Sequence, residues 1–149
     1  MEFRYEYEKT LPAEQVDIEI GETAQRGYRE TEFHYHGQIR TLINPGWYVD
    51  DEDMQGLHAN EDQKQYAINI NRAKAEIDGL LLPEDIRNLR ELLGLTKEEA
   101  GIRLGGGHNG FGKYETGEIL PSKALNNVLT LLQRDPEQLD NIPEPLNWN

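Results

Sequence analysis

The stretch of sequence that decides the fold covers residues 95–117 and reads LTKEEAGIRLGGGHNGFGKYETG. Thr96 stands three residues before Glu99, which is the spacing of a capping box. In this motif the threonine oxygen accepts the Glu99 N–H and the glutamate reaches back to the threonine N–H. The motif predicts a helix that begins at Lys97. We expect it to end near Leu104, because the three consecutive glycines that follow favour positive φ angles and are poor helix formers.

A second, short helix is predicted after the glycines, from His108 to Glu115. Phe111 and Tyr114, three residues apart, would face inward, and Asn109 and Lys113, four apart, would face solvent on the opposite side. A helix, a tight turn and a second short helix make a helix-turn-helix, the motif that places its second helix in the DNA major groove. We therefore expect the two solvent-facing side chains to contact DNA.

Three further helices are predicted around this pair. One runs from Pro83 to Gly94, one begins at Pro121 and Ser122, and a short one covers residues 136–142. The middle one carries an apolar stripe at i, i+3, i+4 and i+7, formed by Leu125, Val128, Leu129 and Leu132. We interpret this stripe first as domain core, with part of it left over for a dimer interface. Five helices in about 60 residues are typical of a small all-α DNA-binding domain.

These residues resemble MqsA-type antitoxins, a branch of the Xre/Cro-like helix-turn-helix proteins. The resemblance covers about residues 80–142 and depends on the glycine triplet followed by the pattern x-Asn-x-Phe-x-Arg/Lys-Tyr-Glu-x-Gly. In that family the asparagine and the basic residue of the recognition helix read base edges, which correspond to Asn109 and Lys113 here. The resemblance also implies a homodimer on palindromic operator DNA that represses its own operon, with a toxin bound elsewhere on the chain.

The residues expected at the DNA are Thr96, Lys97, Gly107, His108, Asn109, Gly110 and Lys113. His108 at the start of the recognition helix could contact a phosphate or a base, or could simply cover the turn. The glycine triplet does not predict nucleotide binding, because the strand before it and the Lys-Ser/Thr after it that a phosphate-binding loop needs are both missing.

The N-terminal half departs from the family in its cysteines. MqsA-type antitoxins carry an N-terminal zinc-binding domain with two Cys-x-x-Cys pairs, the second after an aromatic pair in a segment like residues 45–48. Here Val49 and Glu52 stand at the thiolate positions, and the chain has no cysteine. A tetrahedral thiolate site is therefore impossible, and we predict no metal and no cofactor. Either this half keeps the small β fold with an apolar core, which we favour, or it has a different fold.

Alternating apolar and polar residues predict a small antiparallel sheet in this half. Its strands are expected at Val16–Ile20, Thr31–His36 and Ile39–Ile43. Apolar residues then recur at helical spacing from Glu61 to Gly79, with Asn60 as a candidate N-cap. The fold class is therefore α+β, with an acidic β-rich domain at residues 1–60, a linker helix at 61–80, a C-terminal five-helix Xre-like helix-turn-helix domain at 81–142 and a tail at 143–149.

Two clusters in the N-terminal half are interpreted as structural. Glu32, His34 and His36 share one face of a predicted strand and could bind a metal, but histidines two residues apart on a solvated strand are usually polar surface. Trp47 and Tyr48 are interpreted as core anchors rather than as a ligand-binding box.

The charge of the chain opposes DNA binding, because affinity for DNA comes largely from neutralising phosphates. The net charge is −13, of which residues 1–82 carry −9 and residues 83–142 carry −3. We expect weak, salt-sensitive binding by a monomer and useful affinity only from a dimer on two half-sites. The acidic N-terminal half, with the run Asp50–Asp53, is suited to a basic toxin protein, although acidic surface also keeps a protein soluble.

The sequence does not predict an enzyme, because it lacks a recognisable nucleophile-base-acid set and its only serine, Ser122, stands at a helix cap. No apolar run approaches 18 residues and no basic-then-apolar leader is present, so we expect a cytoplasmic protein without a membrane partner. Our hypothesis is an antitoxin that neutralises a toxin and represses its own operon. The alternatives are a helix-turn-helix-scaffold interaction module or inhibitor without operator binding, and a plain repressor with no toxin.

Overall fold

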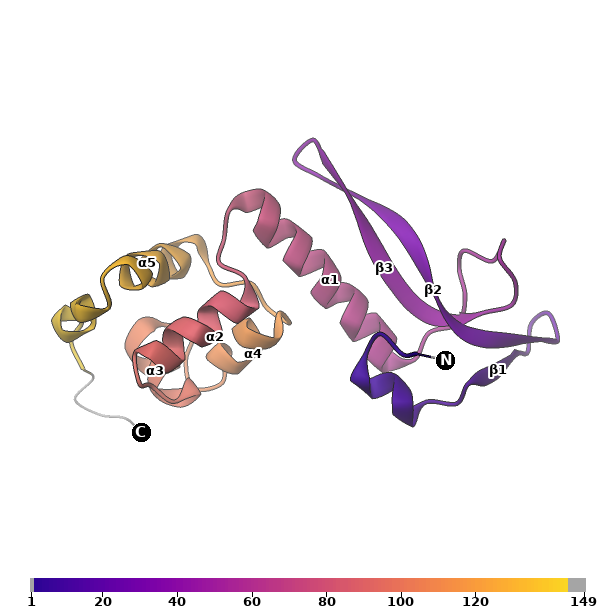
Figure 1. Cartoon of the computed structure of the whole chain (residues 1–149), viewed down its shortest axis with the longest axis horizontal. Helices are drawn as coiled ribbons and strands as arrows, with labels where there is room; N and C mark the ends of the chain where they lie inside the picture. Colours follow the sequence, from indigo (N-terminus) through magenta and orange to yellow (C-terminus); the bar gives the residue numbers. More distant parts are fainter. Residues whose placement is uncertain (1, 145–149) are drawn as a thin grey trace. The chain divides into compact units, whose positions relative to one another are not determined.

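The computed structural model describes residues 2–144 and has an α+β fold (Figure 1). The chain forms two compact units, of which the first ends at Asn69 and the second begins at Ile70. The division falls inside α1 (Asn60–Asp78). Of the tail expected at residues 143–149, residues 145–149 lie outside the described part of the chain. No helix within residues 2–144 combines the length and the apolar character needed to cross a membrane.

The first unit contains a three-stranded antiparallel sheet in the order β1-β2-β3 (Figure 1). Its strands are β1 (Glu14–Asp17), β2 (Glu22–Tyr35) and β3 (Gln38–Tyr48). The second and third strands form one long hairpin, closed by a two-residue turn between the paired Tyr35 and Gln38. The predicted small antiparallel sheet is therefore confirmed, but all three strands have different bounds from those expected.

The predicted first strand is wrong at its end, because residues 18–20 form a turn instead of continuing it. The Asp17 carboxylate accepts the Glu19 N–H at 3.0 Å, and the Asp17 carbonyl oxygen accepts the Gly21 N–H at 2.7 Å. These bonds reverse the chain directly after β1. The alternation of apolar and polar residues also did not predict the first half of β2, because the buried Arg26 interrupts the pattern there.

The helix that follows the sheet begins at Asn60, and Asn60 is not its N-cap. Instead, the carboxylate of Asp62 in the first turn accepts the Ala59 N–H at 2.9 Å. Trp47 and Tyr48 at the end of β3 are buried, with 5% and 4% of their surface exposed, as expected for core anchors.

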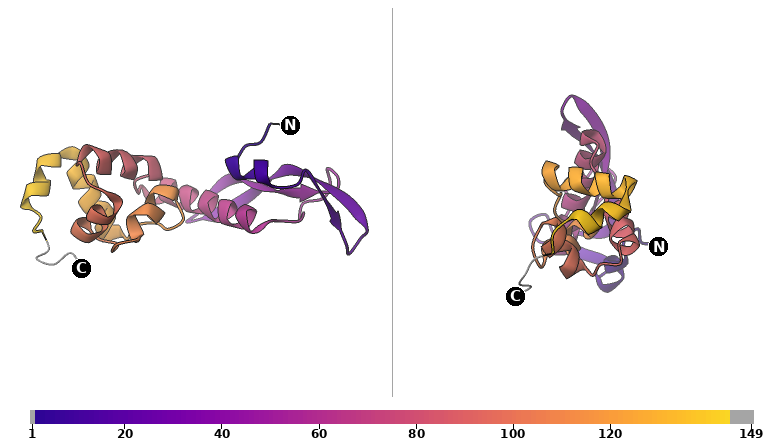
Figure 2. Two further views of the ribbon diagram at one scale, coloured as in Figure 1. Left: turned by 90° about the horizontal axis from the view of Figure 1, so that it is seen from below. Right: turned by 90° about the vertical axis from the view of Figure 1, so that its left-hand side faces the viewer.

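The second unit consists of short helices around one apolar core, seen from two further directions in Figure 2. After the end of α1 these elements are α2 (Pro83–Leu92), α3 (Lys97–Leu104), α4 (Gly110–Thr116), α5 (Lys123–Arg134) and the 3-10 helix η2 (Pro136–Asn141). The predicted helix starts at Pro83 and Lys97 are confirmed, and Ser122 accepts the Leu125 N–H at 3.1 Å as the cap of α5.

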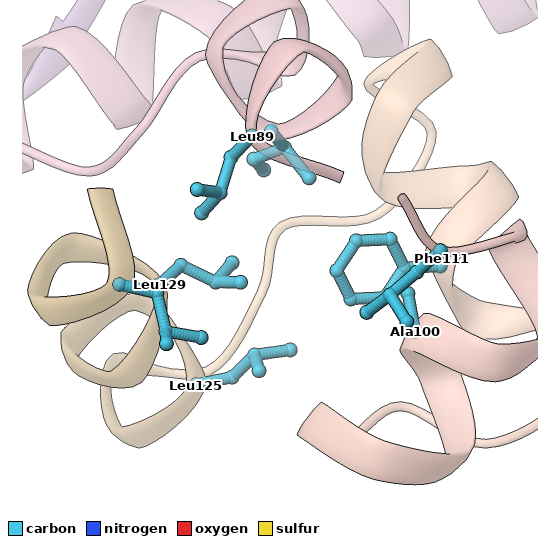
Figure 3. Packing of buried hydrophobic residues seen from close by; sticks show 8 residues of the cluster. Leu89, Ala100, Phe111, Leu125 and Leu129 are labelled. Atoms are coloured by element: carbon cyan, nitrogen blue, oxygen red, sulfur yellow. The ribbon is translucent and has the colours of Figure 1, made fainter. Parts of the chain in front are cut away.

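The core of the second unit is built from four helices and the turn before α3. Figure 3 shows Leu89 from α2, Ala100 from α3, Phe111 from α4 and Leu125 and Leu129 from α5 packed in one interior. Phe111 has no exposed surface. The Phe111 side chain fixes α4 against the rest of the unit. The position of α4 therefore depends on core packing as well as on the turn before the helix.

Candidate functional site

The candidate nucleic-acid interface begins at the start of α3. Thr96 Oγ1 accepts the Glu99 N–H at 3.1 Å, which is the threonine half of the capping box. Thr96 and Lys97 are both exposed at the surface. The cap therefore places a hydroxyl-bearing residue, a lysine and the free N–H groups of a helix start at one place, a combination that suits phosphate contacts.

The turn between α3 and α4 packs directly against the backbone of α3. The N–H groups of Gly105 and Gly107 donate to the Gly101 carbonyl oxygen at 3.1 Å and 3.2 Å. A Cβ atom on Gly101 would lie 1.9 Å from the Gly107 oxygen, so only glycine allows this approach. The φ angles of Gly105, Gly106 and Gly107 are +131°, +99° and +75°, which L side chains rarely adopt.

The recognition helix, α4, starts two residues later than predicted. It begins at Gly110 rather than His108, because the glycine triplet needs two more residues to complete the reversal before α4. Asn109 is consequently the N-cap residue, with φ −109° and ψ −4°. Asn109 and Lys113 are both exposed. The structure thus leaves an amide and an ammonium group on the surface of α4 and its cap, with Phe111 on the buried side.

His108 is joined to α3. Its Nδ1 lies 2.8 Å from a carboxylate oxygen of Glu98, and both side chains are about half exposed. The contact connects the turn to the first turn of α3, in keeping with the turn-covering interpretation. A DNA contact by this ring would have to exchange or share the Glu98 interaction, and it stays a prediction.

Several basic residues of the second unit are already paired. The Arg90 guanidinium makes two bonds to the Glu115 carboxylate, at 2.7 Å and 3.0 Å, and this pair is largely buried. The hydrogen bonds that Arg90 donates to the Glu115 carboxylate raise the pKa of Arg90. Arg103 is 11% exposed and donates to the carbonyl oxygens of Leu139 and Ile142. These bonds fix the C-terminal part of the unit, so the Arg103 guanidinium is engaged within the unit and is not free for a phosphate.

A recess of about 240 Å³ lies beside this pair. It is lined by Arg87, Arg90, Lys97, Glu115 and Thr116. The stem of Lys97 also passes close to α4, since a Cβ atom on Gly112 would be 3.7 Å from Lys97 Cδ. The recess thus brings three basic side chains and the start of α3 to the C-terminal end of α4.

The apolar stripe of α5 is divided between core and surface. Leu125, Leu129 and Leu132 are 7%, 1% and 1% exposed and pack in the core of the unit, and Val128 is half-buried. A groove of about 550 Å³ lies between α5 and η2, with Val128, Leu131 and Ile142 among its lining. Leu131, which the predicted stripe does not include, is 63% exposed. A partner would therefore meet Val128 and Leu131 at the α5–η2 groove, whose lining also includes Leu132. Leu125 and Leu129 do not line this groove.

A buried ion cluster joins η1 (Glu6–Thr10), β2 and α1 in the first unit. Arg26 bonds to Asp62 through two nitrogens at 2.8 Å each and to Glu8 at 2.5 Å, and all three side chains are at most 1% exposed. The guanidinium carbon lies 4.6 Å from the centre of the Trp47 ring. Burial opposes ionisation of Asp62, but hydrogen bonds from Arg26 and Tyr7 outweigh it and keep its pKa below the usual value. Sequence reasoning missed this cluster, because its members lie 18 and 36 residues apart.

The zinc that the family resemblance implies does not fit this unit. Val49 is apolar and half-buried, Glu52 is exposed, and the chain has no thiolate. Glu32 and His34 lie 3.3 Å apart on an exposed strand. Within residues 2–144, no three His, Cys, Asp or Glu side chains are grouped so that they could hold a metal ion. The ion cluster around Arg26, by contrast, connects three separate elements of the same unit.

Comparisons with known proteins extend over most of the chain. A family model described as the antitoxin component of a bacterial toxin-antitoxin system, MqsA, matches residues 20–143. Antitoxin MqsA of Escherichia coli strain K12 is 31% identical over 89 residues, which make up 59% of this chain and 68% of that protein. The family match includes the whole candidate interface and most of the sheet.

Proposed function

The chain belongs to the MqsA family of bacterial antitoxins, and from this premise we propose that it neutralises a toxin by protein binding and represses its own operon as a DNA-bound homodimer. The observation that carries the DNA-binding part is the exposed pair Asn109 and Lys113 on α4 and its cap. The α4 helix is anchored by a fully buried phenylalanine and by the close approach of the turn to Gly101. Such anchoring gives side chains a fixed geometry for reading bases.

We assign direct readout to Asn109 and Lys113 and backbone contacts to the residues around them. The Asn109 amide is suited to a bidentate contact with adenine, which is worth about 1–3 kcal/mol of discrimination. Thr96, Lys97 and His108 lie at the start of α3 and in the turn, where they suit phosphates. Gly107 and Gly110 flank the pair His108 and Asn109, and their lack of a side chain suits a close approach of the sugar-phosphate backbone.

Dimerisation belongs to the same proposal, because a palindromic operator needs two recognition helices about 34 Å apart. The apolar groove between α5 and η2 supports it, because Val128 of the stripe and the exposed Leu131 beside the stripe both line the groove. The net charge of −13 favours a second candidate, an interaction module that keeps this scaffold but does not bind operator DNA. A plain repressor with no toxin is the remaining alternative.

Binding to the chain's own promoter fragment at about 0.1 M salt tests the DNA-binding part. We expect the wild type to bind and the double variant Asn109→Ala/Lys113→Ala to lose sequence discrimination. The matched control, Asn88→Ala/Lys9→Ala, removes the same two groups from exposed positions elsewhere and should bind as the wild type does. Equal binding by all three proteins would exclude base readout by α4, and no binding by any of them would favour the interaction module.

The toxin part of the proposal is tested with the protein encoded by the neighbouring reading frame. We expect that protein to arrest growth when it is expressed alone and to be neutralised by co-expression of this chain. We also propose that the chain acts by binding alone, without catalysis, in the cytoplasm. The family of antitoxins and the use of Ser122 as a helix cap support this view.

A further inference from the structure

A groove of about 580 Å³ lies in the first unit between the β1–β2 turn and the loop that follows β3. Its two walls are held by hydrogen bonds within each loop. The turn is closed by the Gly21 N–H and the Asp17 carbonyl oxygen. In the other loop, the Asp53 carboxylate accepts the N–H groups of Val49 and Gly56 at 3.0 Å and 2.9 Å. The groove is thus formed before any partner arrives.

Three large apolar side chains stand exposed along one wall of this groove. Ile18 is 90% exposed, Ile20 is 59% exposed and Val16 is 57% exposed. All three line the groove, and they come from five consecutive residues at the end of the sheet where β1 meets β2 (Figure 1). Isolated apolar side chains are normal on a surface, but a contiguous group rimmed by polar residues marks an interaction site.

The rest of the lining is acidic. The groove carries six carboxylates and no lysine or arginine, the acidic residues being Asp17, Glu19, Glu22, Asp50, Glu52 and Asp53. Hydrogen bonds from the Val49 and Gly56 N–H groups hold the pKa of Asp53 below its usual value, so its charge persists at neutral pH. The groove therefore presents exposed apolar side chains among negatively charged ones.

We propose that this groove is the docking surface for a basic face of the toxin, one that presents an apolar side chain among lysines or arginines. The inference rests on the proposed function and adds the place and the chemistry of the contact. Complementary charge raises the rate of encounter and excludes acidic partners. A second copy of this chain is disfavoured as the occupant, because two facing grooves would bring twelve carboxylates together.

The experiment measures binding of the protein encoded by the neighbouring reading frame to the full chain and its variants. We expect Ile18→Thr/Ile20→Thr to weaken binding by about tenfold or more, as loss of central anchors does. The matched control is Ile39→Thr, because Ile39 is 55% exposed on the β2–β3 hairpin. Its binding should equal that of the wild type.

A second set of variants tests the charges with little change of shape. Glu19→Gln/Glu22→Gln/Glu52→Gln should slow association and flatten its dependence on salt. Glu2→Gln/Glu30→Gln/Glu61→Gln removes the same charge from exposed positions outside the groove and should have a clearly smaller effect. These glutamine variants keep the test decisive if the threonine variant loses its fold, which circular dichroism would detect.

The possible outcomes separate the groove from the proposed function. If the wild type itself does not bind the neighbouring protein, the toxin part of the proposed function is wrong and the groove assignment falls with it. If the wild type binds and both groove variants bind equally well, the groove assignment alone is wrong. Sedimentation gives the last outcome: a groove variant that turns a dimer into a monomer would show that the occupant is a second copy, which also overturns the assignment.

Discussion

Replacing Arg26 with methionine should lower the free energy of unfolding of the first unit far more than a surface substitution does. The reason is that it leaves two buried carboxylates without their counter-charge. In the native structure the guanidinium makes three hydrogen bonds, two to Asp62 and one to Glu8, and lies over the Trp47 ring. Methionine preserves much of the apolar stem but none of these bonds. Glu8 and Asp62 have no exposed surface, so water cannot replace the lost partner without rearrangement.

The magnitude follows from the cost of isolating a buried charge. Removing one partner of a buried ion pair costs about 3–5 kcal/mol, whereas an exposed pair contributes about 0–1 kcal/mol. A small domain has a free energy of unfolding of about 5–15 kcal/mol in total. The single variant is therefore expected to lose a large part of the stability of its unit. The triple variant Arg26→Met/Glu8→Gln/Asp62→Asn should regain part of this loss, because no net charge remains buried.

Urea unfolding monitored by Trp47 fluorescence measures this effect, with Trp148 replaced by phenylalanine so that one indole reports. Arg40→Met, on the β2–β3 hairpin, serves as the control for losing an arginine from the same sheet. The reasoning is refuted if Arg26→Met costs less than about 1 kcal/mol, the range of an exposed pair. It is equally refuted if the triple variant is no more stable than the single one.

Three other predictions concern the turn, the alkaline limit and metal. Gly101→Ala should lower the melting temperature measured by circular dichroism, although alanine normally favours a helix by about 1 kcal/mol, because its Cβ would lie 1.9 Å from the Gly107 oxygen; an unchanged or higher melting temperature would contradict the close packing of the turn. Burial raises the pKa of Tyr48 from 10.0 to about 12, so its contribution to stability is complete below pH 10 and is lost as the pH rises toward 12. A titration of tyrosinate absorbance follows this loss. A free energy of unfolding that stays constant between pH 10 and pH 12 would contradict the prediction. A chelator should leave the melting temperature unaltered, since no thiolate is present, and a clear drop would reveal a missed histidine-carboxylate site.

The parts of the fold that could be predicted are those with local signals. Pro83, Thr96 and Ser122 each mark a helix start through their own geometry or hydrogen bonding, and all three helices begin where these residues indicate. The start of α4 could not be derived in this way, because it depends on the path that three consecutive glycines take and on their contact with Gly101.

In the candidate sites, too, features with a local sequence signal could be predicted, and features that depend on contacts between distant residues could not. The exposure of Asn109 and Lys113 was expected from their spacing, but the half-helical position of Asn109 was not. The first half of β2 was missed, because Arg26 is an inward-pointing charge whose partners come from η1 and α1. The α5 stripe is mainly domain core, as expected, but which of its members stay accessible could not be predicted, because burial of Leu125, Leu129 and Leu132 depends on how four helices meet. The dimer interface on this stripe stays a prediction.

The cluster around Arg26 has a consequence for how this unit responds to oxidising stress. Peroxide attacks thiolates and can release the zinc that they hold, but a guanidinium bonded to two carboxylates offers no sulfur for such a reaction. The chain's methionines are Met1 and Met54, and Met54 lies 54% exposed in a surface loop outside the cluster. The interior of the unit should therefore survive oxidants that dismantle thiolate-bound metal, and strong acid, which protonates Asp62, is the condition that would loosen it.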